Sequence, residues 1–388
     1  MPDISHPATG QTIFGDGSRP SLITGAVWAG LVSLILVPGF FAALDTQTAF
    51  SPAALQVHET LFAYLGAVIA GFVLTSIPEW TGRPPLHARA LTVLIVAWLA
   101  GRAAVAASGF VGPLVAGGVD CLFLALTAIT AATEAAKGRG GKALPPIGLL
   151  IVFLAGNAVF YLGSYGSGSG EAGKRIGIAA AVILVTLIGG RTAFGRNAPD
   201  AQTAEPAPFG ALGVATVAVS GLALLAWIIL PDYRASAALM LLAGIVQAVR
   251  LARWVFDRSP QTTLTLVQQL AYAFIPLGFL VIGGGVLFGH DQSGGVDVRA
   301  WMVSATGILT LAMMARISPD AAARSPSART MARVIYAAIA VVAVTRLFGG
   351  LTWILPVIGG AALMLLFAVF VIGYLPVLAR PGKNLAAV

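Results

Sequence analysis

The sequence predicts an all-α protein, a polytopic bundle of transmembrane helices. Charged residues make up only 10% of the chain, hydrophobic residues make up 58%, and the mean hydropathy is +0.90. Soluble domains carry about 25% charged residues. The apolar runs are continuous and do not alternate with polar residues, which favours helices over a membrane barrel. A helix also satisfies its own backbone hydrogen bonds within lipid.

Twelve apolar segments are candidates to cross a bilayer, which takes roughly 20 mainly apolar residues. The third, sixth and eleventh are short, so ten spans is the nearest alternative. We expect the spans near residues 22–44, 57–78, 91–107, 112–133, 145–164, 176–190, 211–231, 235–252, 266–287, 299–317, 332–348 and 353–376.

The tails and the orientation follow from the polar segments. Residues 1–20 are polar and rich in Gly and Pro, so we expect a tail and no signal peptide. Residues 21–379 form the membrane domain and residues 380–388 a second tail. With both termini cytoplasmic, most of the 23 Lys and Arg residues fall on the cytoplasmic side. Anionic lipid headgroups then account for the net charge of +8 without nucleic acid.

An adjacent histidine and glutamate stand out, because ionisable groups are costly inside lipid. We expect His58 and Glu59 in the first turn of the second span, at its outer end. The helix dipole favours a glutamate there, so Glu59 suits either an interfacial or a functional role. His58 suits either an interfacial imidazole or a metal ligand.

Arg102 and Asp120 lie on the third and fourth predicted spans, which the turn SGFVG joins. Adjacent antiparallel helices would bring both side chains to a similar depth, and each charge would be expensive there without a partner. We therefore expect a mutual ion pair. It would either set the register of the two helices or belong to a proton or ligand relay.

Neutral polar residues within the spans are expected to bond across helices, and together they could line a cavity. The single cysteine, Cys121, lies in an apolar run, which excludes an intramolecular disulfide, a CxxCH haem attachment and a thiolate metal cluster. The neutral polar residues are Asn157, Tyr161, Gln247, Gln268, Gln269 and Tyr272.

The segment VHETLFAYLGAVIAGFVLTSIPEWTGRPPL, residues 57–86, resembles the signature region of the NnrS family of bacterial membrane proteins. In that family a helix beginning around HE is followed by a PxWTGxP turn. The pieces WLAGRAAV, GNAVFYLG and GILTLAMMARIS come later in the order that the family would have them. The resemblance covers nearly the whole chain.

This resemblance implies a twelve-helix protein of the bacterial inner membrane that binds haem and copper and takes part in the response to nitric oxide and nitrosative stress. It assigns the chemistry to histidines at outer helix ends, and here the sequence departs from the family. Gln56 replaces the first histidine of HxHE, so only His58 remains. Arg299, Tyr161 and Gln269 stand at other positions where the family would offer histidine.

If haem or copper is retained, the resemblance implies that His58 holds it. Glu59 would act from another helix face and support the site without ligating the metal. Arg299 has no lone pair for a metal, but it can bond a haem propionate or Glu59. Tyr272 completes the candidate cofactor-binding residues.

Two interpretations of the missing histidines stay open. Either the chain binds one haem or copper through His58, or the metal sites are gone and the scaffold does something else. A secondary transporter is the main alternative, since that class commonly has about twelve spans. An enzyme such as a nitric oxide reductase is disfavoured, because a chain with four histidines has too few for a binuclear site. The expected partners are the lipid bilayer and nitric oxide or another small ligand.

Overall fold

The computed structural model describes residues 48–288, except 85, 139, 167–168, 195–209 and 257–262, together with Trp301 and short helical pieces between 330 and 369. The first predicted span, at 22–44, lies outside these residues, as does the tenth apart from Trp301. The eleventh and twelfth are described only in the short pieces. The total of twelve spans and the cytoplasmic location of both termini therefore stay predictions.

Every predicted span from the second to the ninth is helical, and the described residues contain no strand. The helix assigned to the second span begins earlier than expected, at Pro52, and the sixth span is longer at both ends than its apolar core. The elements are α3 (Pro52–His58), η1 (Glu59–Leu65), α4 (Gly66–Thr81), α5 (Ala88–Ala106), α6 (Ser108–Val111), α7 (Pro113–Lys137), η2 (Gly140–Ala143), α8 (Leu144–Gly166), α9 (Glu171–Phe194), α10 (Ala211–Ile229), α11 (Arg234–Val255) and α12 (Thr263–Phe288).

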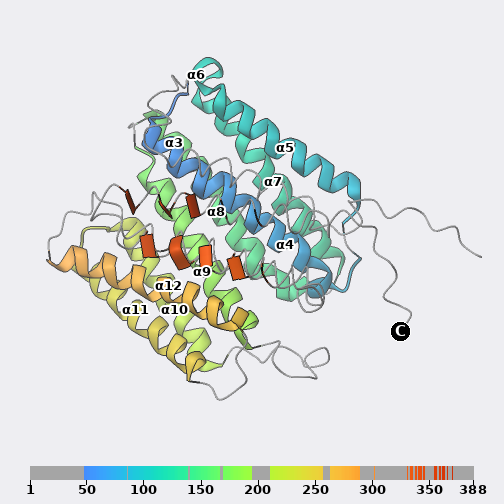
Figure 1. The fold of residues 1–388 in the computed structure, drawn as a ribbon. Helices are drawn as coiled ribbons and strands as arrows, with labels where there is room; N and C mark the ends of the chain where they lie inside the picture. Colours follow the sequence, from blue (N-terminus) through green and yellow to red (C-terminus); the bar gives the residue numbers. More distant parts are fainter. Residues whose placement is uncertain are drawn as a thin grey trace, which may run out of the picture.

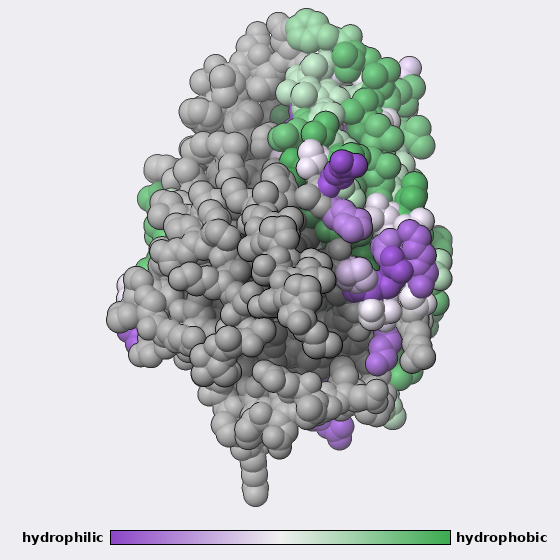
Figure 2. Space-filling view, turned by 90° about the vertical axis from the view of Figure 1, so that its right-hand side faces the viewer, coloured by the Kyte–Doolittle hydropathy of each residue, from purple (hydrophilic) through white to green (hydrophobic). Residues whose placement is uncertain are grey.

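Six of the described helices are long and apolar enough to cross a membrane: α5, α7, α8, α10, α11 and α12. Their outer faces carry exposed large apolar side chains, as lipid contact requires, and Figure 2 shows a broad apolar area beside a group of hydrophilic residues. Examples on α7, α8, α10 and α11 are Leu122, Ile129, Ile151, Leu222, Leu225 and Ile245. The described part of the chain is therefore a membrane protein.

Helices that follow one another in the chain pack side by side, as in α7 with α8, α8 with α9, α10 with α11 and α11 with α12. Helix α9 also contacts η1, α10 and α12. It therefore joins the group of α3, α4, α5, α7 and α8 to the group of α10, α11 and α12 (Figure 1).

The turn between α5 and α7 reverses the direction of the chain, so that the two helices pack antiparallel. Gly112 has a φ of 82°, a conformation that side chains other than glycine rarely adopt. Pro113 follows at the start of α7, where its fixed φ suits a first helical turn and its missing N–H costs nothing. The resulting hairpin places the second half of α5 against the first half of α7.

Helices α8 and α9 approach closely because glycines face each other across their contact. A Cβ atom on Gly156 of α8 would lie 2.7 Å from the backbone nitrogen of Gly177 on α9. A Cβ atom on Gly177 would lie 2.7 Å from the ring of Phe62 in η1. Small residues at such crossings let helix backbones meet in a membrane.

We expect Gly156→Ala to lower the free energy of unfolding by about 1–3 kcal/mol, since the new methyl group meets backbone atoms that cannot move away. Gly148→Ala is the matched control, because Gly148 lies on the same helix and no atom lies within 4 Å of the position that its methyl group would take. Thermal unfolding of both variants in detergent measures the difference. Equal melting temperatures for the two variants would contradict the close packing of α8 on α9.

Candidate functional site

The candidate site is built around His58, the last residue of α3. Its side chain is fully buried, with 0% exposure. Phe50 stacks on the imidazole with ring centres 5.7 Å apart and an interplanar angle of 14°. Tyr161 meets the imidazole edge-on at 5.1 Å, and Phe62 and Phe160 close other sides at 5.7 and 5.5 Å. His58 is therefore an interior residue and not the half-wetted imidazole of a membrane interface.

A π-helix begins directly after His58. The element η1 runs from Glu59 to Leu65, and short π-helical segments are frequently found at functional sites. The sequence predicts Glu59 on another helix face, as a group that supports His58 without ligating a metal. In the structure its Oε1 lies 3.1 Å from Nδ1 of His58, so both side chains belong to one interior site.

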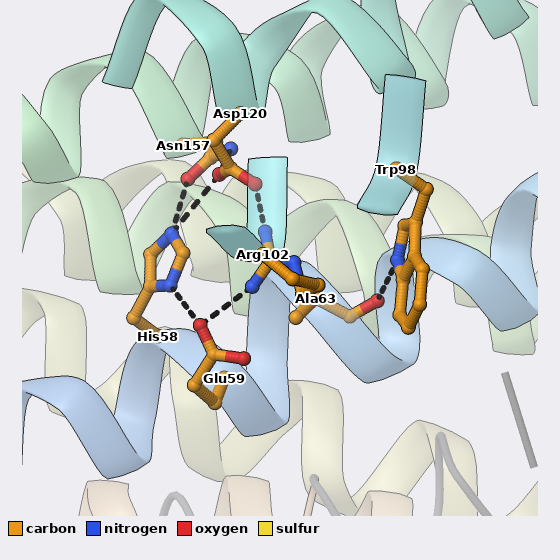
Figure 3. A network of polar contacts seen from close by, with 7 residues as sticks. All are labelled: His58, Glu59, Ala63, Trp98, Arg102, Asp120 and Asn157. Atoms are coloured by element: carbon orange, nitrogen blue, oxygen red, sulfur yellow. Dashed lines mark hydrogen bonds and ion pairs between the residues drawn. The ribbon is translucent and has the colours of Figure 1, made fainter. Parts of the chain in front are cut away.

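Each nitrogen of the His58 ring contacts an acidic side chain. Nδ1 lies 3.1 Å from Oε1 of Glu59, and Nε2 lies 3.1 Å from Oδ2 of Asp120. Nε2 is also 3.2 Å from Oδ1 of Asn157. Asn157 in turn donates from Nδ2 to Oδ2 of Asp120 at 2.8 Å. Figure 3 shows these contacts converging from η1, α3, α7 and α8.

Arg102 completes the group and joins its two carboxylates. Nη1 donates to Oε1 of Glu59 at 2.5 Å, and Nη2 donates to Oδ1 of Asp120 (Figure 3). The contact predicted between Arg102 and Asp120 is thus present in the structure, with Glu59 as an additional partner that the sequence spacing did not indicate. We call His58, Glu59, Arg102, Asp120 and Asn157 the buried polar network.

The segment WLAGR of α5 supplies three separate features that position Arg102. Trp98, one helical turn before it, donates from Nε1 to the carbonyl of Ala63 in η1 at 3.2 Å. The guanidinium carbon of Arg102 lies 5.8 Å from the centre of the Trp98 ring. Gly101 lets α7 approach, because a Cβ atom there would lie 3.0 Å from the Cα atom of Asp120. Helix α5 is thereby held to both η1 and α7 around the site.

Burial makes these charges depend on one another. Glu59, Arg102 and Asp120 are 3%, 6% and 4% exposed. A charge without a partner at such a depth costs several kcal/mol, whereas a well-bonded set of opposite charges largely offsets its own desolvation. The arrangement suits either a rigid registration of four elements or a site that binds and moves a proton, the two roles expected for an ion pair here.

Tyr272 belongs to a different polar cluster. Its hydroxyl donates to Oε1 of Gln247 at 2.5 Å and lies 3.1 Å from Nη1 of Arg250. Gln247 also donates to the hydroxyls of Thr186 and Ser220 at 3.1 and 2.9 Å, so this cluster links α9, α10, α11 and α12. The structure does not bring Tyr272 together with His58.

Arg250 is a buried residue that sequence reasoning did not single out. It is 5% exposed within α11. Its guanidinium carbon lies 4.8 Å from the ring centre of Trp254. The spacing of Gln247 and Arg250, one helical turn apart, is a signal that could have placed both on the inner face. Gln269 meanwhile bonds the carbonyl of Trp254 at 3.3 Å.

The other positions where the family would offer histidine, and the other histidines of this chain, are only partly described. Arg299, His6, His290 and the side chain of Gln56 lie outside the described part of the structure. His87 is exposed before α5. Tyr161 lies beside His58, and its buried hydroxyl has no hydrogen-bond partner among the described residues.

The described residues do not fit a haem or copper centre at His58. A metal needs a free lone pair on an imidazole nitrogen, and both nitrogens of His58 face protein oxygen atoms at 3.1 Å. Aromatic rings occupy the space around the imidazole. Among the residues that the structure describes, no three His, Cys, Asp or Glu side chains form a metal-binding group. In this geometry a metal would have to displace Glu59 or Asp120.

The fold and the site together define a multi-pass α-helical membrane protein with a charged network buried among its helices. Comparison with known families makes the assignment specific, since the family described as NnrS protein matches residues 12–381. The chain belongs to the NnrS family. It has no match among curated proteins and none among solved structures.

We expect Arg102→Gln or Asp120→Asn alone to destabilise the protein by about 3–5 kcal/mol, because each leaves a buried opposite charge without its main partner. The double variant should recover part of this loss. Folded yield and thermal unfolding in detergent measure the three variants. Arg83→Gln is the control: Arg83 pairs with Glu134 at 2.5 Å but is 35% exposed, so its loss should matter little. A double variant no better than either single one would contradict the pairing.

Proposed function

We propose that this protein acts in the response of the bacterial inner membrane to nitric oxide and nitrosative stress, as a non-enzymatic member of the NnrS family. The match of the family to residues 12–381 supports this role, because it spans nearly the whole chain. The described helices are those of a membrane protein.

The observation that carries the location of the functional centre is the buried polar network. Ionisable residues within membrane spans are rare, and they usually mark ligand sites or proton pathways. Here a histidine, two carboxylates and an arginine contact one another at the meeting point of α3, η1, α5 and α7. We therefore infer that the family role of this chain depends on His58 and its neighbours.

Haem and copper, which the family resemblance implies, fit this centre poorly. Any haem or copper that the protein carries would need ligands other than His58, since Glu59 and Asp120 already occupy both imidazole nitrogens. Arg299 remains a candidate partner for an anionic group such as a propionate. The role that we propose therefore runs through the charged side chains of the network and not through a metal on His58.

A secondary transporter is the second candidate function, and the mixed charges of the network favour it over an inert scaffold. Transporters place ionisable groups between helices, where a proton or an ion can bind. Purified protein in sealed vesicles would distinguish the two functions: a transporter moves a solute or protons down an imposed gradient, whereas a stress-response binding protein does not.

The proposed role predicts that the wild-type gene restores growth under a nitric oxide donor to a bacterium that lacks its own NnrS protein. His58→Gln should lose this protection at an equal amount of membrane protein, because it removes the imidazole that faces both Glu59 and Asp120. Glu134→Gln should keep it, since Glu134 lies outside the network. Failure of the wild type to protect would refute the role, and full protection by His58→Gln would refute the location of the centre.

The geometry of His58 also predicts the cofactor content of the purified protein. After expression with haem and copper supplied, wild type and His58→Gln should carry the same amount of each per chain, because both nitrogens of His58 are already engaged. Absorption in the Soret region and elemental analysis measure the two cofactors. A haem spectrum that disappears with His58→Gln would show that the imidazole is an axial ligand after all.

A further inference from the structure

The buried polar network is one hydrogen atom short when His58 is neutral and both Glu59 and Asp120 are ionised. A neutral imidazole has one N–H donor and one nitrogen lone pair. In His58 both nitrogens face carboxylate oxygens, Oε1 of Glu59 and Oδ2 of Asp120, each at 3.1 Å. Whichever tautomer His58 takes, one nitrogen lone pair would meet an oxygen lone pair. The structure thus contains one contact without a hydrogen atom to bridge it.

Asn157 does not supply the missing hydrogen. In the observed orientation its Nδ2 donates to Oδ2 of Asp120 at 2.8 Å, and its Oδ1 lies 3.2 Å from Nε2 of His58. Rotating the amide by half a turn would offer a donor to Nε2 but would set the amide oxygen against Oδ2. Either orientation leaves two acceptors in contact.

We propose that the network is a proton-binding site that holds one proton between Nε2 of His58 and Oδ2 of Asp120. With this proton both imidazole nitrogens have a partner of the right kind. The charges of the five residues also balance, since the bound proton and the guanidinium of Arg102 offset the two carboxylates. A neutral cluster is far less costly to bury among helices than one with a net charge.

The position of Arg102 decides which contact holds the proton. Its Nη1 donates at 2.5 Å to Oε1 of Glu59, the same oxygen that faces Nδ1 of His58. Its Nη2 donates to Oδ1 of Asp120 and not to Oδ2. Among the described residues, Oδ2 therefore faces the neutral amide of Asn157 and the imidazole, so it is the oxygen that accepts or shares a proton most readily.

The groups around the site favour a proton over a metal ion as its ligand. Titratable and charged groups surround His58. Glu59 of η1, Asp120 of α7 and Tyr161 of α8 contact its ring, and Arg102 of α5 bonds both carboxylates. A divalent cation would stand beside the fixed positive charge of Arg102, which cannot lose its proton. A single proton adds one charge and needs no more space than the existing contact.

The test uses the full-length protein in detergent at about pH 8, well above the ordinary histidine pKa of about 6.5. Nuclear magnetic resonance of histidine-labelled protein reports whether His58 is doubly protonated, and infrared spectroscopy reports protonated carboxyl groups. The chain has four histidines, so a variant that combines His6→Gln, His87→Gln and His290→Gln leaves His58 as the single labelled histidine and assigns its signal. We expect one bound proton in the wild type, seen either as a His58 imidazolium or as a protonated carboxyl that Asp120→Asn removes.

Asp120→Asn should lose the bound proton, because the amide that replaces the carboxylate can itself donate to Nε2. Glu134→Gln, which changes a carboxylate outside the network, should keep it. A singly protonated His58 together with no carboxyl band sensitive to Asp120→Asn would overturn the proposal. Should that variant fail to fold, the wild type decides. A His58 ring with one proton, together with no hydrogen bond from a protonated carboxyl group to Nε2, overturns the proposal. A doubly protonated His58 ring, or a protonated carboxyl group bonded to Nε2, supports it. This result is independent of any role in nitric oxide tolerance.

Discussion

The described structure depends most on the two contacts of one guanidinium, that of Arg102. A buried arginine stays charged, so it must find carboxylates at the correct distance and direction. Its two partners come from different elements, Glu59 from η1 and Asp120 from α7. Helix α5 can therefore occupy only a position that serves both. Buried ion pairs add little net stability, but they strongly disfavour arrangements that separate the charges.

Close packing of the helices and the polar network require each other. Gly101 admits the backbone of α7 beside Arg102, and Gly156 admits α9 beside α8. In lipid, apolar side chains gain little by leaving one neighbour for another, so association relies on close contact and on bonds between helices. The buried polar network supplies such bonds between η1, α5, α7 and α8. The cluster of Gln247, Arg250 and Tyr272 supplies them between α11 and α12.

Helix α9 connects these two polar centres. Its glycine face receives Phe62 of η1, whose ring also lies beside His58, and its Thr186 accepts a bond from Gln247. The aromatic rings around His58 exclude water from the first centre, and this strengthens every charge interaction within it.

The sequence by itself determined the class of structure and part of the site. Long apolar runs admit only helices in lipid, because no water is present to bond an open backbone. The short turn before Pro113 also sufficed to predict that Arg102 meets Asp120. Only the tertiary structure decided that Glu59 joins them, that Asn157 closes the network and that Tyr272 lies elsewhere. The reason is that Glu59 meets Arg102, and Asn157 meets His58, across elements that lie far apart in the sequence, and only the packing of those helices brings them together. The π-helix from Glu59 to Leu65 also departs from the 3.6-residue period on which a sequence-based prediction of helix faces relies.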